Sequence, residues 1–495
     1  MSNYIMAIDQ GTTGSRVMIV DKTGRIVSSE YAEFPQIYPR PGWVEHNPEE
    51  IWDTTLMVMR NALKASGKSA ENIQGVGITN QRETTVLWDK DTLKPVHNAI
   101  VWQCRRSAPI CDALKQKGLE NEFRDKTGLV LDAYFSGSKI KWLLDEIPGL
   151  KARAETGKIA FGTIDAWLIA KLTGGKVHAT DYTNASRTLM FNIHEKAWDE
   201  DLLKHLGIPL GILPDVVSSA QITGQIDSDI LGASIPIAGI AGDQQAALFG
   251  QGCFSEGQAK NTYGTGCFLL LNVADKKITP ADGLILTLAC GPDGKPCYAL
   301  EGSIFIAGAV VQWLRDGMGL IARAEETQGI AQSVTDTQGV YLVPAFAGLG
   351  APHWDMYARG GVLGITRGTT RAHIVRAALE GIAFQVKDLM VAFENVAQIK
   401  FHELRVDGGA CKNDFLMQFQ ADILNCPINR SQHIESTAMG AAFLAGLATE
   451  YWTSPGEIEQ LRRSDRIFEP NIGQAERDSL YQGWLEAVER VKSQK

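Results

Sequence analysis

The strongest constraint on the fold is a succession of short strands at the start of the chain, interrupted by a turn rich in Gly and Thr. Residues 4–8 are apolar and lead into residues 9–14, Asp-Gln-Gly-Thr-Thr-Gly. Strand character resumes in residues 17–34, around a hairpin turn at 21–24. Because the Gly/Thr turn feeds a strand and not a helix, the alternating order of a dinucleotide-binding sheet is excluded.

A helix and a further strand complete this first pattern. Asn47 is a preferred N-cap residue, Pro48 suits the first helical position and Glu50 the third. An apolar segment over residues 73–79 then predicts a strand. The order strand, strand, strand, helix, strand is typical of a ribonuclease H-like unit.

A second copy of the pattern begins near the middle of the chain, which at 495 residues is too long for one hydrophobic core. Strands are expected at 259–263, 267–273, 284–289 and 297–300, with a turn at 264–266 and a helix from about Ser303.

Each half then closes with a strand that runs into a turn of small residues. In the first half residues 235–240 lead into 241–243, and in the second half residues 404–406 lead into 407–410. We therefore expect two tandem α/β domains, residues 1–250 and 251–495. Two such domains should face each other across a cleft, the usual place for a ligand site.

Charge and cysteine content exclude several classes of protein. The net charge is −9, from 48 Lys and Arg against 57 Asp and Glu, which argues against a general binder of nucleic acid or anionic membranes. No apolar stretch reaches the ~20 residues that span a bilayer, and the first residues lack the charged region of a signal peptide. The eight cysteines contain no C-x-x-C pair. We expect reduced, mostly buried thiols in a cytoplasmic protein.

The first motif that carries chemistry is the turn of residues 9–14 with Arg16 after it. Its glycines let backbone N–H groups approach a polyanion, and the hydroxyls of Thr12 and Thr13 can donate to one. Asp9 could hold a hydrated Mg²⁺ and Arg16 could pair with a phosphate. The alternative is an ordinary hairpin turn.

Two further motifs place small residues between a strand and a helix. Residues 239–245 bring Asp243 to a helix N-terminus, where backbone donors and the dipole favour an anion; Asp243 as a simple N-cap is the alternative. Residues 407–410, with Asn413 one turn on, suit a planar base and ribose, or are simply a tight turn. Two Asp-bearing turns suit phosphoryl transfer, with one carboxylate organising a metal and the other accepting a proton.

Competing motifs fail on their spacing. Residues 66–69 (Ser-Gly-Lys-Ser) look like the end of a P-loop, but Ala62 stands where Gly is required. The sequence has no G-x-G-x-x-G after a strand, no G-x-S-x-G and no H-E-x-x-H.

Four segments resemble the two phosphate elements and the adenosine element of the sugar-kinase, actin and heat-shock chaperone superfamily: residues 9–16, 242–245, 264–266 and 407–410. Residues 134–146 and 360–380 are similar to the two signatures of the FGGY family of carbohydrate kinases. Within that family, residues 81–83, 101–106 and 240–250 resemble the members that act on glycerol.

The resemblance implies ATP-dependent phosphorylation of a terminal hydroxyl of glycerol, giving sn-glycerol 3-phosphate and ADP. Asp243 would be the catalytic base. The implied glycerol contacts are Arg82, Glu83, Trp102, Tyr134, Asp243, Gln244 and Phe268. The implied nucleotide contacts are Thr12, Thr13, Gly14, Arg16, Thr265, Gly308, Gln312, Gly409 and Asn413. Mg²⁺ would be held by Asp9, Asp243 and Gln244, largely through water.

Two other functions remain open at this point. A kinase of another polyol or ketose shares the nucleotide motifs, and an ATP-driven structural or chaperone protein shares the superfold. We expect no nucleic-acid partner, no membrane insertion, and a homodimer or homotetramer. Residues 224–236 lack Arg, Lys and His. The fructose 1,6-bisphosphate loop and the phosphorylatable His of some relatives are therefore expected to be absent.

Overall fold

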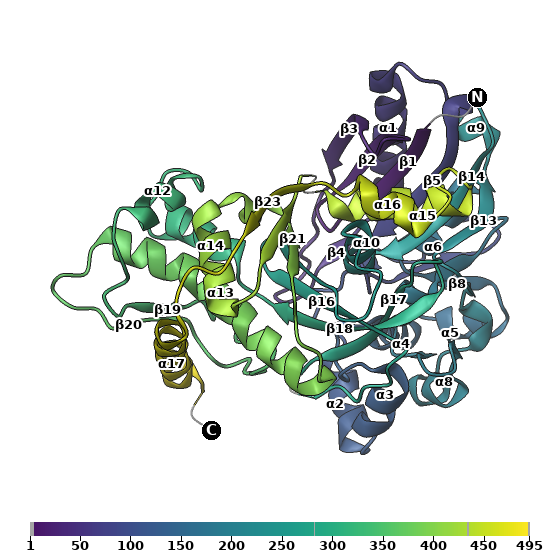
Figure 1. The fold of residues 1–495 in the computed structure, drawn as a ribbon. Helices are drawn as coiled ribbons and strands as arrows, with labels where there is room; N and C mark the ends of the chain where they lie inside the picture. Colours follow the sequence, from purple (N-terminus) through teal and green to yellow (C-terminus); the bar gives the residue numbers. More distant parts are fainter. Residues whose placement is uncertain (1–3, 282, 433–434, 494–495) are drawn as a thin grey trace. The chain divides into compact units, whose positions relative to one another are not determined.

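The computed structural model describes residues 4–281, 283–432 and 435–493, and these form two compact units (Figure 1). The first unit runs to Phe254 and also takes in Leu286–Tyr298 and Ser436–Arg462. The second comprises Ser255–Ile285, Ala299–Glu435 and the chain from Arg463 onward. A single cut in the sequence therefore does not describe the two units, because two segments of the second half pack with the first.

The first unit is built on a six-stranded sheet of order β13-β14-β5-β1-β2-β3. The strands are β1 (Tyr4–Gln10), β2 (Gly14–Asp21), β3 (Ile26–Glu33), β5 (Ile73–Asn80), β13 (Ala220–Ile226) and β14 (Ile235–Gly242). β1, β5 and β14 are parallel neighbours, whereas β2, β3 and β13 pair antiparallel. The expected ribonuclease H-like α/β order is confirmed in this unit.

Alternating side chains of β1 divide between two hydrophobic cores, as a strand buried on both faces requires. Met6 and Ile8 pack in one core with Ile51 of α1 (Pro48–Ser66). Residues on the other face pack with α15 (Ser436–Ala448). α15 approaches the sheet so closely that a Cβ on Gly77 would lie 2.0 Å from the carbonyl oxygen of Ala441.

The predicted start of α1 is confirmed. The side chain of Asn47 accepts a hydrogen bond of 3.0 Å from the backbone N–H of Glu49, and Pro48 is the first helical residue. Ile51, Thr55, Val58, Met59 and Ala62 are all buried, at the spacing of one helix face.

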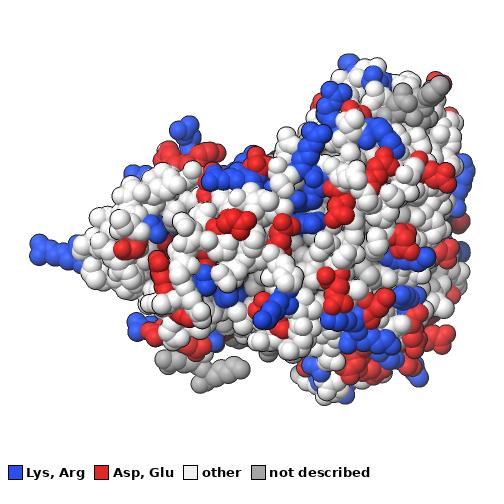
Figure 2. Space-filling view, viewed as in Figure 1, with Lys and Arg blue, Asp and Glu red and all other residues white. Residues whose placement is uncertain are grey.

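The remaining elements of the first unit include the short strands and helices around the sheet. They are β4 (Glu45–His46), β6 (Val86–Asp89), β7 (Ala99–Ile100), α2 (Ala108–Gln116), α3 (Glu120–Thr127), α4 (Ser136–Glu146), α5 (Leu150–Glu155), β8 (Ile159–Gly162), α6 (Ile164–Leu172), β9 (Ala179–Asp181), α7 (Tyr182–Ala185), β10 (Phe191–Asn192), β11 (Ala197–Trp198), α8 (Glu200–Leu206), β12 (Asp215–Val217), α9 (Ser228–Leu231), α10 (Asp243–Gly250) and α16 (Pro455–Leu461). Over the region of α2 and α3, basic and acidic side chains are interspersed (Figure 2).

The second unit repeats the same topology. Its sheet has the order β17-β18-β16-β15-β21-β22-β23, in which β17 from Leu286 and the start of β18 up to Tyr298 belong to the first compact unit. The strands are β15 (Ala259–Tyr263), β16 (Cys267–Ala274), β17 (Ile285–Cys290), β18 (Pro296–Ile304), β21 (Leu404–Asp407), β22 (Ile428–Ser431) and β23 (Ser464–Phe468). The other elements are α11 (Gly308–Gln312), α12 (Glu326–Gln332), β19 (Tyr341–Val343), β20 (Gly361–Leu363), α13 (Arg371–Ala397), α14 (Asp414–Leu424) and α17 (Gln474–Val491).

The topology corrects one expected equivalence between the two halves. β21 pairs parallel with β15, as β5 pairs with β1, and β22 lies beyond β21, as β14 lies beyond β5. The turn after β21 therefore corresponds to the turn after β5, and not to the turn after β14 as expected. The order of elements along the chain could not show this, because the equivalence depends on strand pairing.

The helix expected from about Ser303 begins later than predicted. β18 continues to Ile304, and α11 begins at Gly308. The backbone N–H groups of Gly308 and Ala309 donate to the carbonyls of Gly264 and Thr265, at 3.0 and 3.1 Å. The turn 264–266 thus satisfies the first donors of α11.

Two expectations from composition can be compared with the structure. Seven of the eight cysteines are buried, and Cys297 is intermediate. Within the described part of the chain, none of the helices combines the length and apolar character that crossing a membrane requires.

Candidate active site

The predicted polar residues of the first unit meet at one edge of its sheet. Asp9 of β1 and Ala241 of β14 are both in register with Thr79 of β5. The carboxyl ends of these three parallel strands therefore bring Asp9, the turn 81–83 and Asp243 to the same edge, which is where α/β sheets bind ligands.

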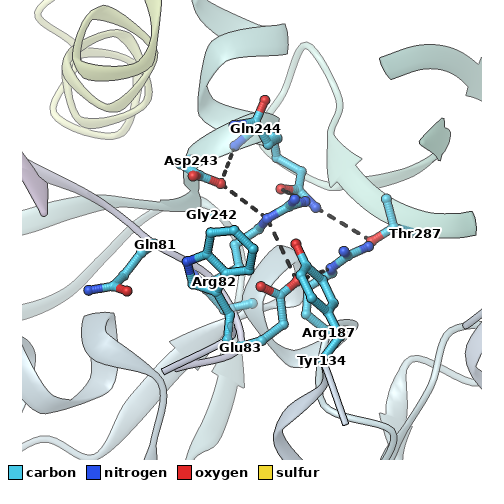
Figure 3. Close-up of polar contacts among 12 residues, drawn as sticks. Gln81, Arg82, Glu83, Tyr134, Arg187, Gly242, Asp243, Gln244 and Thr287 are labelled. Carbon is cyan, nitrogen blue, oxygen red and sulfur yellow. Dashed lines mark hydrogen bonds and ion pairs between the residues drawn. The ribbon is translucent and has the colours of Figure 1, made fainter. Parts of the chain in front are cut away.

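Asp243 is the first residue of α10, and Gly242 is its N-cap. One carboxylate oxygen, Oδ1, accepts hydrogen bonds from the backbone N–H of Gln244 at 2.7 Å and pairs with Nε of Arg82 at 3.1 Å (Figure 3). The Asp243 side chain is 31% exposed, whereas that of Arg82 is 2% exposed. A buried cation thus holds a carboxylate that an external substrate can reach.

A buried network of charges surrounds Arg82 and Glu83. Nη1 of Arg82 donates to Oε1 of Gln245 at 3.1 Å, and Nε of Arg187 pairs with Oε1 of Glu83 at 2.6 Å. Nε of Arg82 lies 3.9 Å from the same Glu83 oxygen. Glu83 has a φ of 59°, in the left-handed region that non-glycine residues seldom adopt. Glu83 is held in this conformation with its carboxylate against a guanidinium.

Trp102 and Tyr134 form an aromatic wall in the same unit. Their rings meet edge to face with centroids 5.5 Å apart, and Nε1 of Trp102 donates to the hydroxyl of Thr12 at 3.0 Å. The ammonium of the fully buried Lys139 donates to the backbone carbonyl of Tyr134. Burial lowers the pKa of Lys139 to about 8. The wall is therefore anchored to the Gly/Thr turn at one end and to α4 at the other.

The Gly/Thr turn is closed by its own backbone. The N–H of Gly11 donates to the carbonyl of Gly14 at 2.9 Å, and a Cβ on Gly14 would lie 2.5 Å from the carbonyl oxygen of Ala32. The hydroxyl of Thr13 lies 3.4 Å from that of Tyr31, and the guanidinium of Arg16 lies 5.3 Å from the centroid of the same ring. The hydroxyls of Thr12 and Thr13 thus belong to a turn of fixed shape.

The predicted nucleotide residues of the second unit gather at the corresponding sheet edge. The carbonyl of Thr265 accepts from the backbone N–H of Ala307 at 2.8 Å, directly before Gly308. A Cβ on Gly408 would lie 2.5 Å from the carbonyl oxygen of Tyr263, so the turn after β21 packs against the end of β15.

The remaining predicted residues of that unit are distributed around this edge. Gly409 faces open space, Gln312 is exposed, and Asn413 caps α14 by accepting from the N–H of Leu416 at 3.0 Å. Phe268 is the second residue of β16 in the second unit, and β16 directly follows the turn 264–266. Its place in a glycerol pocket stays a prediction.

The donor set is suited to a magnesium ion held through water. Asp9, Asp243 and Gln244 offer only oxygen ligands, which Mg²⁺ prefers. β1 and β14 flank β5, so their ends are about 10 Å apart, two strand spacings. Among the described residues no group of three or more His, Cys, Asp or Glu could hold a metal directly. The residues present therefore fit an ion that keeps most of its water.

Sequence reasoning missed several residues of this network. Arg187, Gln245 and Thr287 all lie in it, with Nε2 of Gln245 donating to the Thr287 hydroxyl at 3.4 Å (Figure 3). Arg187 carries no local sequence signal, because it lies 104 residues from Glu83. Its role is visible only in the structure, where Arg187 is completely buried. A buried guanidinium requires a partner such as a carboxylate.

Two α/β units of this topology, each with a Gly-rich turn at a sheet edge, define a protein of the ribonuclease H-like superfold. The chain belongs to the FGGY family of carbohydrate kinases: residues 4–250 match the family's N-terminal domain and residues 259–449 its C-terminal domain.

Relatives match the chain over almost its full length. It is 57% identical to the glycerol kinase of Caldanaerobacter subterraneus subsp. tengcongensis, with 99% of each chain covered. The crystal structure of Plasmodium falciparum glycerol kinase with ADP is 40% identical, covers 100% of this chain and 99% of its own, and has a TM-score of 0.94. Gluconate kinase from Lactobacillus acidophilus is 25% identical, with 98% and 97% covered and a TM-score of 0.87.

Proposed function

We propose that this protein transfers the γ-phosphoryl group of ATP to a terminal hydroxyl of glycerol, giving sn-glycerol 3-phosphate and ADP. The observation that carries the proposal is the buried Arg82–Glu83 turn, which places a guanidinium and a carboxylate beside the accessible carboxylate of Asp243. Such fixed partners suit a small molecule made almost entirely of hydroxyl groups. The 57% identity to a glycerol kinase over the full chain supports the same substrate.

Each residue of the first unit has a distinct role in this proposal. Asp243 accepts the proton of the attacking hydroxyl, and Arg82 holds its carboxylate in place. Arg82, Glu83 and Tyr134 bind the glycerol hydroxyls, with Gln244 beside them. Trp102 and Phe268 are assigned to the carbon edge of glycerol. Arg187 holds the Glu83 carboxylate in position through the buried ion pair of 2.6 Å.

The nucleotide and the metal complete the proposal. Thr12, Thr13, Gly14, Arg16 and Thr265 bind the phosphates, and Gly308, Gln312, Gly409 and Asn413 bind the rest of ADP. Mg²⁺, held through water by Asp9, Asp243 and Gln244, would neutralise charge on the transferred group. We also propose that residues 1–250 and 251–495 are the two domains along the sequence, with two segments of the second domain packed in the first compact unit. We further propose a cytoplasmic location and a homodimer or homotetramer.

A coupled assay of ADP release tests the function directly. Glycerol, dihydroxyacetone, xylulose, erythritol and gluconate are compared at one ATP concentration, with a reaction lacking acceptor as the control. We expect kcat/KM for glycerol to exceed that of every other acceptor. Preference for xylulose or gluconate would support the alternative kinase of another polyol or ketose, and ADP release independent of any acceptor would support a structural or chaperone ATPase.

A further inference from the structure

Asp181 is a buried carboxylate that the proposed reaction does not use. It is fully buried at the start of α7, and burial raises its pKa. It accepts from the N–H and hydroxyl of Thr183, the N–H and side-chain amide of Asn184, and the hydroxyl of Ser219, at 2.7 to 3.1 Å. Capping a helix of four residues does not require a carboxylate with so many donors.

One arm of this network reaches the residue before Asp243. The Thr183 hydroxyl has a single hydrogen, which points to the Asp181 carboxylate, 2.8 Å away. Its lone pairs are thereby directed to the backbone N–H of Gly242, which donates to it at 2.8 Å. Gly242 is the N-cap of α10, so this contact fixes the point from which Asp243 projects.

A second arm reaches the turn that carries Arg82 and Glu83. The side-chain amide of Asn184 donates to Asp181 at 3.0 Å and to the side-chain carbonyl of Asn80 at 3.1 Å. The Asn80 amide donates back to Asn184 at 3.0 Å and to the backbone carbonyl of Gln81 at 2.9 Å. Asp181 thus determines which way the Asn184 amide faces, and that amide holds the end of β5.

We propose that Asp181 is a positioning residue that fixes the Asp243 turn through Thr183 and the Arg82–Glu83 turn through Asn184. It keeps the proton acceptor and the substrate-binding groups in one geometry, although it touches neither substrate nor nucleotide. This inference rests on the proposed function only for the roles of the two turns. The two arms make separate predictions, because one turn carries the base and the other the binding groups.

The first arm is tested by Thr183→Val, which keeps the shape and removes the hydroxyl. We expect kcat to fall about 10-fold from a misplaced base, with the KM for glycerol nearly unchanged. Thr183→Ser, which keeps the hydroxyl, should restore kcat. The matched control is Thr173→Val, since Thr173 is equally buried and its hydroxyl also bridges two groups, the Ile169 carbonyl and the Val177 N–H. A wild-type kcat in Thr183→Val, or an equal loss in Thr173→Val, would overturn the proposal.

The second arm is tested by Asn184→Ala, for which we expect the KM for glycerol to rise about 10-fold with a smaller change in kcat. Asp181→Asn should combine both effects. If Asn184→Ala and Thr183→Val change kcat and KM in the same proportion, the residues are merely structural and the proposal is wrong.

Hydrogen exchange measured in the absence of substrate tests the positioning role of Asp181 independently of the proposed function. Hydrogen exchange in peptides covering residues 239–245 should be faster in Thr183→Val than in the wild type, and unchanged in Thr173→Val. Unchanged exchange in Thr183→Val contradicts the positioning role even if the enzyme phosphorylates glycerol. Faster exchange supports that role even if the wild type prefers another acceptor.

Discussion

The indole of Trp102 donates a hydrogen bond of 3.0 Å to the hydroxyl of Thr12. Thr12 lies in the Gly/Thr turn that we assign to the nucleotide phosphates, and Trp102 lies in the wall that we assign to glycerol. One hydroxyl therefore connects the two proposed binding regions. Because Thr12 uses a lone pair for Trp102, its own hydrogen stays available to donate to a phosphate oxygen.

Thr12→Val should weaken the binding of both substrates. Loss of the acceptor frees the Trp102 ring and leaves its N–H without its partner, so we expect the KM values for glycerol and for ATP both to rise, by roughly 5- to 20-fold, the size of one hydrogen bond. The control is Thr13→Val, since the Thr13 hydroxyl lies near Tyr31 instead; it should raise only the KM for ATP. Equal glycerol affinity in the wild type and Thr12→Val, measured by calorimetry, would show that the link is incidental.

Asp243→Asn should abolish most of the turnover while keeping glycerol affinity. The amide oxygen can still accept from Arg82 and from the N–H of Gln244, so the turn keeps its shape. It cannot take a proton, and we expect kcat to fall by about 10² or more. Stopped-flow or steady-state turnover with a parallel binding measurement checks this. Near-normal kcat would remove Asp243 from the role of base.

Local patterns predicted the parts of the site that lie within one turn of the chain. The Asp9 turn, the α1 cap at Asn47 and the Asp243 turn are each determined by a few consecutive residues. Gly, Asp and capping residues set the conformation of the nearby backbone or hydrogen-bond to it. The sequence also indicated that the two halves share a topology. It did not show which turns of the two halves correspond, because the position of β21 beside β15 is decided by long-range pairing.

The supporting network could not be read from the sequence. Arg187, Asp181 and Gln245 acquire their roles through partners up to 163 residues away. Neither the periodicity nor the spacing of residues in the sequence indicates such long-range contacts. A polar residue that is buried in the fold cannot be distinguished in the sequence from one at the surface. The residues that we assign to the substrates were therefore proposed from local motifs, whereas the residues that hold them in place were found only from the fold.

Arg187→Met should destabilise the first unit by leaving the buried Glu83 carboxylate without its principal partner. The ion pair of 2.6 Å is fully buried, and Arg82 remains only at 3.9 Å. We expect a loss of about 3 kcal/mol in the free energy of unfolding, measured by urea denaturation. The double variant with Glu83→Gln should recover part of this loss, since no unpaired charge remains. If the double variant is as unstable as the single, packing of the Arg side chain and not charge is responsible.

Stability should fall in mild acid because of His46. This side chain is fully buried, and burial lowers its pKa from 6.5 to about 4. Between these values the unfolded chain binds a proton that the folded chain does not, so acid favours unfolding and stability is lost as the pH falls from 6.5 toward 4. We expect about 2 kcal/mol from this residue at pH 5.

The control for His46 is the variant His46→Gln, compared with the wild type at pH 7.5 and pH 5. The variant should lose less stability than the wild type between the two pH values, whatever its absolute stability. Identical pH dependence in the two proteins would show that His46 is not the group that titrates.

Fructose 1,6-bisphosphate should not inhibit glycerol phosphorylation. Residues 224–236, which form the end of β13, α9 and the start of β14, carry no Arg, Lys or His. Their Asp227 is paired with Lys176 at 3.0 Å, so this neighbouring cation already has an anionic partner. A bisphosphate needs several cationic or N–H donors to replace its lost hydration. Titration into the glycerol assay, with sulfate at matched ionic strength as the control, should leave the rate unchanged. Saturable inhibition below 1 mM, absent with sulfate, would show that an effector site forms from other residues.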